Sequence, residues 1–307
     1  MTRIGPDSRG VYIIAATPFT DTLEVDGDGI DRVTDFYLEK GADGITVLGM
    51  MGEAPKLTPA ESVEVVKRTI ARAQGKPVVV GVSAAGFVAM RNLAHQAMDL
   101  GAAGVMVAPA GTKTDKQIRD YYGNAVEAIG DDIPLVLQDF PLATGITIDT
   151  DLMIDIFKAY PSIVMLKHED WPGLTKISRL REAEDRIGRR LSILVGNGGM
   201  FLAEEMARGA DGAMTGFAYP EMMVGVCRAA AAGNPDAAQD IFDAYLPLAR
   251  YEQQPGLGLA IRKYLLHRRG ALGTPRLRRP GATLSARDIA DIERLVARQE
   301  KRLATLG

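Results

Sequence analysis

The stretch Gly41-Ala-Asp-Gly-Ile-Thr-Val47 decides the fold, because the chain repeats it as Gly101-Ala-Ala-Gly-Val-Met-Val107 and Gly209-Ala-Asp-Gly-Ala-Met-Thr215. In each copy a segment of helical period ends at the first glycine, and a short apolar segment begins at the second. Glycine just past the end of a helix is a common C-cap, since it adopts left-handed backbone angles without a Cβ clash. The repeat therefore predicts three equivalent helix-to-strand turns in a chain of repeated units.

Short apolar runs recur along the first two thirds of the chain, and segments with helical period separate them. Runs that are almost wholly apolar are typical of parallel strands buried on both faces. They cover 11–16, 44–48, 77–82, 103–107, 133–137, 163–166, 191–195 and 212–215. Eight such units predict an α/β fold of the (β/α)8 TIM-barrel type. A doubly wound sheet is disfavoured, because Ala16-Thr-Pro-Phe19 stands where that fold needs a glycine-rich turn.

The last third of the chain has only helical segments, at 222–231, 236–250, 258–269 and 285–306, with an extended basic linker before the last of them. We therefore predict a barrel over residues 1–220 and a C-terminal helical extension over 221–307. The extension is expected to pack on the barrel, so that both parts form a single structural unit.

Composition excludes several classes of protein. Of 307 residues, 47% are hydrophobic, and the net charge is −3, so neither nucleic acid nor an anionic membrane is an expected partner. The lone cysteine, Cys227, and three well-separated histidines make a metal site unexpected. No apolar run approaches the roughly 18 residues of a membrane span, and the first ten residues do not read as a signal peptide. We expect a cytoplasmic protein.

Catalytic residues of such barrels lie at the carboxyl ends of the strands. Lys167 directly follows the apolar run 163–166, which places it at the barrel mouth. Removal from water disfavours the charged ammonium, and a neutral lysine can condense with a carbonyl to give a Schiff base. The alternative is that Lys167 pairs with Asp139, Glu169 or Asp170 and only stabilises the strand end.

Two glycine-rich turns also follow predicted strands. Backbone N–H groups of Gly49-Met-Met-Gly-Glu53 can bind a carboxylate, although the segment also reads as an ordinary connection. Gly196-Asn-Gly-Gly199, together with Thr215-Gly216, can instead hold a phosphate. The second turn makes a phosphosugar enzyme a third possible function.

Together these segments resemble the dihydrodipicolinate synthase and N-acetylneuraminate lyase family of class I aldolases. Residues 49–53 are similar to the family's GxxGE carboxylate loop, Lys167 to its Schiff-base lysine, and 16–19 to the end of its first strand. The segment 133–145 resembles the one that usually reads Tyr-Asn-x-Pro…Thr-Gly. The resemblance runs from about residue 10 to 300. It implies a 2-oxo acid substrate, no cofactor beyond the covalent Schiff base, no metal, and a homotetramer.

Several polar residues of the family pattern are missing here. Gln138 stands in place of the proton-relay tyrosine, and an amide cannot transfer a proton near neutral pH. Met50 and Met51 replace the loop hydroxyls, Ala143 replaces the arginine that binds a second carboxylate in the synthases, and 109–112 lacks the strand-four tyrosine. These departures argue against true dihydrodipicolinate synthesis.

A different acid or base is therefore expected near the ends of the fifth and sixth strands. The candidates are Asp139, His168 and Glu169. Neighbouring residues of an extended segment point to opposite faces, so only one of His168 and Glu169 faces the site. By the same rule Asp139 points away from Gln138.

We predict catalytic roles for Lys167 and Gln138, of which Gln138 orients the carbinolamine or an acceptor. Substrate contacts are predicted for Gly49, Met50, Met51, Gly52, Asp139, Gly196 and Met214. The two loop methionines favour an apolar substrate part; the alternative is that Met51 fills the neighbouring core.

The function predicted from these features is a Schiff-base lyase, of aldolase or dehydratase type, acting on pyruvate or a longer 2-oxo acid. The alternative is a catalytically weak or inactive barrel that binds a small oxo acid in a regulatory role. That alternative is based on the simultaneous loss of the tyrosine, both hydroxyls and the arginine.

Overall fold

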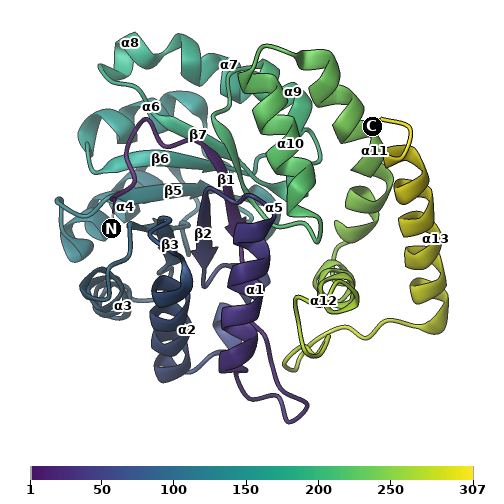
Figure 1. The fold of residues 1–307 in the computed structure, drawn as a ribbon. Helices are drawn as coiled ribbons and strands as arrows, with labels where there is room; N and C mark the ends of the chain where they lie inside the picture. Colours follow the sequence, from purple (N-terminus) through teal and green to yellow (C-terminus); the bar gives the residue numbers. More distant parts are fainter. Residues whose placement is uncertain (1, 307) are drawn as a thin grey trace.

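Eight parallel strands close into a barrel in the computed structural model, which describes residues 2–306 (Figure 1). Each strand pairs with the next in sequence, and the eighth pairs with the first. The strands are β1 (Gly10–Ile14), β2 (Gly44–Val47), β3 (Val78–Gly81), β4 (Gly104–Val107), β5 (Leu135–Asp139), β6 (Ile163–His168), β7 (Ser192–Val195) and β8 (Gly212–Thr215). The predicted α/β class and TIM-barrel architecture are confirmed.

Helices follow the strands and cover the outside of the barrel (Figure 1). They are α1 (Gly27–Glu39), α2 (Pro59–Arg72), α3 (Phe87–Asp99), α4 (Asp115–Ile129), α5 (Pro141–Thr144), α6 (Thr150–Ala159), α7 (Leu174–Glu182), α8 (Glu184–Ile187), α9 (Leu202–Ala207) and α10 (Pro220–Ala231). The segment between β6 and β7 forms two helices, α7 and α8, because the backbone at Ala183 leaves helical angles, with ψ at 2°.

The repeated glycine turn behaves as its sequence predicts. Gly41, Gly101 and Gly209 adopt positive φ angles of 89°, 100° and 96° just past the ends of their helices. The second glycine of each copy is the first residue of β2, β4 or β8. At β8 the close approach of β1 also demands glycine, since a Cβ on Gly212 would lie 2.0 Å from the Gly10 carbonyl oxygen.

Two apolar layers form the core, one inside the barrel and one between the strands and the helices. Val136 and Met165 belong to the inner layer, whereas Leu137 and Leu166 belong to the outer layer. Side chains alternate along a strand, so the next residues of β5 and β6 continue this pattern. The alternation decides which polar residues reach the barrel mouth.

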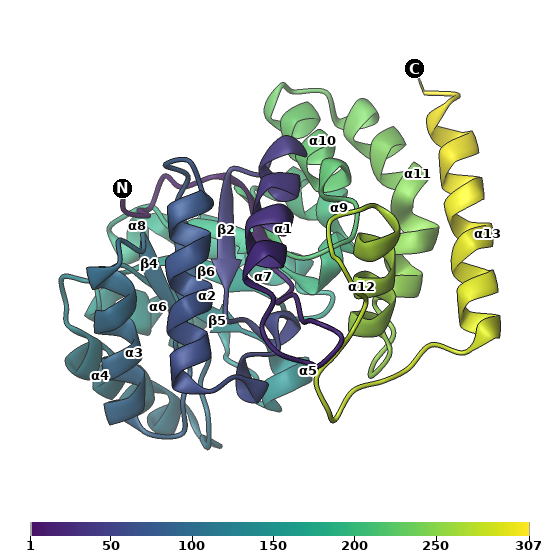
Figure 2. The ribbon, with the colours of Figure 1, turned by 60° about the horizontal axis from the view of Figure 1, so that its bottom comes forward.

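The C-terminal extension begins one helix later than predicted. Helix α10 packs on β1 and β8, which makes it the eighth helix of the barrel, and we place the boundary after Ala231. The extension consists of α11 (Pro235–Glu252), α12 (Gly258–Arg268) and α13 (Ala286–Leu303). Helix α11 contacts α9, α10 and α13, and Figure 2 shows α13 on the outer edge. Within residues 2–306, no helix is both long and apolar enough to cross a membrane.

Candidate active site

Lys167 and Gln138 lie side by side at the carboxyl ends of their strands. They are direct partners in the β5–β6 register. Gln138 stands two residues after Val136, and Lys167 stands two residues after Met165. Because Val136 and Met165 belong to the inner layer, Gln138 and Lys167 share the inner face. Lys167 is only 4% exposed and Gln138 only 7%. Both strands extend further than the sequence indicated, which puts these residues inside the strands rather than after them.

Glu169 joins this pair and is the acidic group of the site. Its Oε2 lies 3.1 Å from the Lys167 Nζ and accepts a 2.6 Å hydrogen bond from the Gln138 side-chain amide. Backbone bonds keep the segment extended: the Glu169 N–H donates to the Asp139 carbonyl at 2.8 Å. Of the three acid/base candidates, Glu169 is the one that faces the lysine.

Gly196 provides the space for this carboxylate. A Cβ at position 196 would lie 2.1 Å from the Glu169 Cγ. Any larger residue would therefore displace Glu169, because real Cβ atoms do not approach other atoms so closely. The structure thus gives Gly196 a positioning role in the site.

Asp139 and His168 lie on the opposite face of the strands. Asp139 is fully buried and accepts a 2.8 Å bond from the Lys176 ammonium, so the predicted substrate contact of Asp139 is wrong. The His168 Nε2 lies 3.1 Å from the Gly173 carbonyl oxygen. Burial raises the pKa of Asp139 to about 6 and lowers the pKa of His168 to about 4. Neither group reaches the barrel mouth, because strand alternation turns them outward.

The predicted carboxylate loop is a tight 3-10 turn over Met50–Gly52. Leu48 and Glu53, which flank it, both have a φ of +57°, an unfavourable conformation for residues with a side chain. The Thr17 hydroxyl donates to the Gly52 carbonyl at 2.6 Å. The first N–H groups of such a turn have no partner within it and are available to an anion.

The two loop methionines have different surroundings. Met50 is 58% exposed, whereas Met51 is partly buried against the inner core. Met214 is fully buried in that core, beneath the mouth, so its predicted substrate contact is wrong. Met214 belongs to the same inner apolar layer as Met165.

The second glycine turn does not form a phosphate cradle. The Gly198 N–H donates to the Thr215 hydroxyl at 2.8 Å, and the Gly199 N–H donates to the Gly196 carbonyl at 2.9 Å. A Cβ on Gly198 would also lie 2.0 Å from the Gln253 amide nitrogen, so the space beside the turn is filled. These contacts contradict the phosphosugar alternative.

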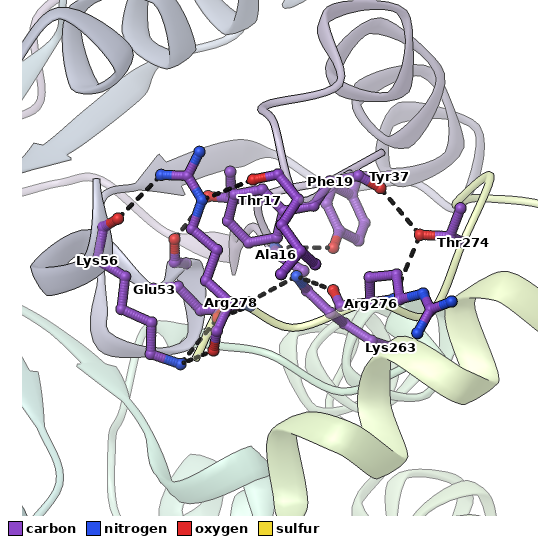
Figure 3. Close-up of polar contacts among 12 residues, drawn as sticks. Ala16, Thr17, Phe19, Tyr37, Glu53, Lys56, Lys263, Thr274, Arg276 and Arg278 are labelled. Carbon is purple, nitrogen blue, oxygen red and sulfur yellow. Dashed lines mark hydrogen bonds and ion pairs between the residues drawn. The ribbon is translucent and has the colours of Figure 1, made fainter. Parts of the chain in front are cut away.

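The C-terminal extension reaches back and holds the carboxylate loop, a feature that the sequence did not reveal (Figure 3). Glu53 is 1% exposed, and its carboxylate accepts from the Lys263 ammonium at 2.6 Å, from the Lys56 ammonium at 2.9 Å and from the Arg278 N–H at 3.0 Å. Lys263 also lies 4.3 Å from the centre of the Phe19 ring. We call Glu53, Lys56, Lys263 and Arg278 the loop clamp.

A cavity of about 510 Å³ opens at the mouth above these elements. Gly49 and Met50 of the carboxylate loop line one part of it, and Gln138 lines another. It continues past the end of β4 toward Phe140 and Thr144. The cavity therefore joins the loop to Gln138, whose side-chain amide donates to Glu169 and which is the direct strand partner of Lys167.

This arrangement of a strand-six lysine, a glycine loop and a C-terminal helical part agrees with a comparison against known families. The model of the dihydrodipicolinate synthetase family matches residues 7–299. The chain belongs to this family. Its resemblance to the family, inferred from sequence motifs, is thereby confirmed.

Relatives within the family carry different names. An L-2-keto-3-deoxyarabonate dehydratase from Azospirillum brasilense is 30% identical over 285 residues, covering 90% of this chain and 89% of its own. A 4-hydroxy-tetrahydrodipicolinate synthase from Methanococcus vannielii is 27% identical over 247 residues, covering 79% and 82%. The crystal structure of a dihydrodipicolinate synthase from Rhodopseudomonas palustris has a TM-score of 0.95 and 51% identity, covering 97% of this chain and all of that one.

Membership of the dihydrodipicolinate synthetase family makes this protein an enzyme, a lyase of the Schiff-base aldolase type. The prediction of enzymatic activity is confirmed at that level. Membership also counts against the alternative of an inactive regulatory barrel.

Proposed function

We propose that the protein forms a Schiff base between Lys167 and a 2-oxo acid, with Glu169 as the proton carrier in place of the missing tyrosine. The observation that carries this proposal is the position of the Glu169 Oε2, 3.1 Å from the Lys167 Nζ and 2.6 Å from the Gln138 amide. A base must lie within hydrogen-bond reach of the proton that it moves, and Glu169 meets that condition.

The first stage is condensation. Glu169 takes a proton from the Lys167 ammonium, and the neutral amine attacks the 2-oxo carbon to give a carbinolamine. The oxygen leaves as water, using the proton returned by Glu169 and one proton from the amine nitrogen. The carboxylate loop holds the substrate carboxylate through the backbone N–H groups of Met50 and Met51, whereas the Gly52 N–H donates to the Gly49 carbonyl. The scheme uses no metal and no organic cofactor.

The second stage uses the iminium as an electron sink. Glu169 takes a proton from C3 to give an enamine, and in a dehydratase it returns this proton to the C4 hydroxyl, which leaves as water. In an aldolase, the C4 hydroxyl instead loses its proton to Glu169 and the C3–C4 bond breaks, which releases C4 as an aldehyde and leaves the enamine of the shortened acid. A relative at 30% identity is named a dehydratase, which supports the loss of water over the cleavage of the C3–C4 bond. Gln138 orients the departing or attacking oxygen by hydrogen bonding.

True dihydrodipicolinate synthesis is not part of this proposal. A tyrosine relay is replaced by Gln138, and Ala143 carries no charge to pair with a second carboxylate. The proposal thus departs from the name of the solved relative at 51% identity. An assay with pyruvate and aspartate semialdehyde tests this point directly, and turnover at a rate typical of enzymes would overturn it.

Borohydride reduction in the presence of pyruvate, followed by peptide mass spectrometry, tests the Schiff base. We expect an adduct on Lys167 and none on the Lys167→Met variant. Absence of an adduct with pyruvate and with longer 2-oxo acids would overturn the proposal. Ligand-induced thermal stabilisation without turnover would favour a binding protein instead.

Glu169→Gln tests the proton carrier, because the amide keeps the size of the side chain and cannot accept the proton. We expect kcat to fall by about 10²–10⁴, while Glu169→Asp retains part of the activity. The matched control is Asp139→Asn, a carboxylate of the opposite strand face. A Glu169→Gln variant with full turnover would exclude Glu169 as the carrier.

A further inference from the structure

We infer that the substrate carries an uncharged, largely apolar group beyond the carbons that react, such as a branched alkyl chain or an aromatic ring. The inference rests on the proposed function, since it assigns the rest of the cavity to the far end of the same 2-oxo acid. It begins from the size of the cavity, about 510 Å³, which is in the range of pockets that hold drug-sized ligands. Pyruvate would leave most of it empty.

The course of the cavity decides which part of the substrate lies where. Gln138, the direct strand partner of Lys167, lines the cavity together with Gly49 and Met50 of the carboxylate loop, so a 2-oxo acid bound to Lys167 enters the cavity past Gln138. In that direction the cavity is bounded by the segment 108–111 and by Phe140. The residues that line this region of the cavity determine which substituent of the substrate the enzyme accepts.

The wall of the cavity is apolar. Among the residues that the structure describes, no aspartate, glutamate, lysine, arginine or histidine lines it. Apolar side chains from the loop after β2, from α3, from the end of β4 and from the start of α5 dominate, and they include Met50, Ala54, Pro55, Leu93, Ala108 and Phe140. A charged substituent would lose its hydration and find no opposite charge.

Three of the four polar side chains in the wall, Ser83, Gln138 and Thr144, form internal hydrogen bonds, and the fourth, Ser62, is buried. The Ser83 hydroxyl oxygen accepts from the Ala108 N–H at 2.9 Å, and the Thr144 hydroxyl donates to the Phe140 carbonyl at 2.9 Å. The Gln138 amide N–H donates to the site carboxylate. A chain with several hydroxyl groups would therefore compete with internal bonds, whereas an apolar group would not.

Met50 is the side chain best placed to contact this group. It is 58% exposed and lines the cavity beside the carboxylate loop. An unbranched thioether adapts its shape to irregular apolar surfaces. The residue that replaces a loop hydroxyl in the family pattern thus becomes a determinant of specificity.

A matched pair of 2-oxo acids tests the inference, since 2-oxohexanoate and 2-oxoadipate have the same carbon skeleton length and differ by a terminal methyl or carboxylate. Each is trapped on Lys167 with borohydride at several concentrations, and pyruvate is the reference. We expect 2-oxohexanoate to be trapped at least about tenfold more efficiently than 2-oxoadipate, because burying an unpaired carboxylate is unfavourable. Equal trapping of the two, or preference for 2-oxoadipate, overturns the inference.

Variants in the wall sharpen the test. Met50→Arg supplies a cation and is expected to shift the ratio toward 2-oxoadipate by about tenfold or more, whereas Met50→Leu keeps the wild-type ratio. Thr144→Arg, on a different element of the wall, serves if the first variant does not fold. An unchanged ratio in a folded arginine variant counts against the assigned direction of the cavity. Failure of pyruvate itself to trap overturns the proposed function, whereas pyruvate trapping with an unselective pair overturns only this inference.

Discussion

Replacement of Lys263 by methionine tests whether the loop clamp stabilises the carboxylate loop. Lys263 is fully buried on α12, and its ammonium contacts the Glu53 carboxylate at 2.6 Å and the Arg276 carbonyl at 2.9 Å. Methionine has nearly the same length and no charge. The variant therefore removes one partner of a buried ion pair and leaves the packing largely intact.

The expected loss follows from what remains around Glu53. Removing one member of a buried pair typically costs about 3–5 kcal/mol, since the other charge stays in the interior. Glu53 keeps two partners, the Lys56 ammonium at 2.9 Å and the Arg278 N–H at 3.0 Å. We therefore expect a decrease of about 3 kcal/mol in the free energy of unfolding, the lower end of that range.

The double variant Glu53→Gln/Lys263→Met gives the interaction energy. Burial lowers the pKa of Lys263 to about 8 even with Glu53 beside it, so the pair does not fully offset its own desolvation. Removing both charges should therefore restore much of the stability lost in either single variant. The thermodynamic cycle is expected to show a coupling of at least about 1 kcal/mol.

Urea unfolding of the four proteins measures these values, with an unchanged m-value as the sign that the folded state is retained. The control is Lys116→Met, which breaks an exposed pair with Asp120 worth at most about 0.5 kcal/mol. The KM for the 2-oxo acid should also rise in Lys263→Met. A loss of stability no larger than that of the control, with an unchanged KM, would refute the clamp.

Three further predictions concern single buried positions. Gly196→Ala should abolish most activity without unfolding the barrel, because the new Cβ would meet the Glu169 side chain; a fully active variant with native circular dichroism would contradict this. Burial raises the pKa of Glu205 to about 8, so folding favours its protonated form and stability should fall as pH rises from about 4.5 to 8. Urea titrations should show a smaller fall in Glu205→Gln, and equal pH dependence would exclude this carboxyl as the cause. The pKa of His168 is lowered to about 4, so below about 6.5 only the unfolded chain gains that proton and stability is lost. Asp139, whose raised pKa of about 6 favours the protonated folded form, opposes this loss, and His168→Gln should therefore gain stability relative to the wild type from pH 6.5 to 4. A constant difference between the two proteins over that range would count against the assignment.

Local sequence was sufficient to predict the fold. The glycines of the three repeated turns act through backbone angles that depend only on their immediate neighbours, and Gly41, Gly101 and Gly209 adopt them. The capping box at Thr58 and Glu61 is equally local, since its two hydrogen bonds span three residues. For the same reason the order of strands and helices could be read from periodicity.

The position of Lys167 and of its neighbours was partly predictable. Lys167 was placed at a strand end by the apolar run before it, and alternation along the strand required that only one of His168 and Glu169 face the site. The sequence did not say which one, because that choice depends on the register of β6 against β5 and on which face is inside. The pairing of Gln138 with Lys167 in the barrel decides it in favour of Glu169.

Only the tertiary structure decided which distant segments of the chain contact one another. Lys263 follows Glu53 by 210 residues, and no local pattern connects them. The depth of Met214 and the outward orientation of Asp139 likewise depend on the closed barrel. By itself the sequence determined the elements, their order and the position of Lys167 at a strand end, because these follow from short-range backbone and solvation preferences. The choice of acid, the clamp on the carboxylate loop and the apolar cavity were decided by packing, because each is formed by residues that meet only when the barrel closes.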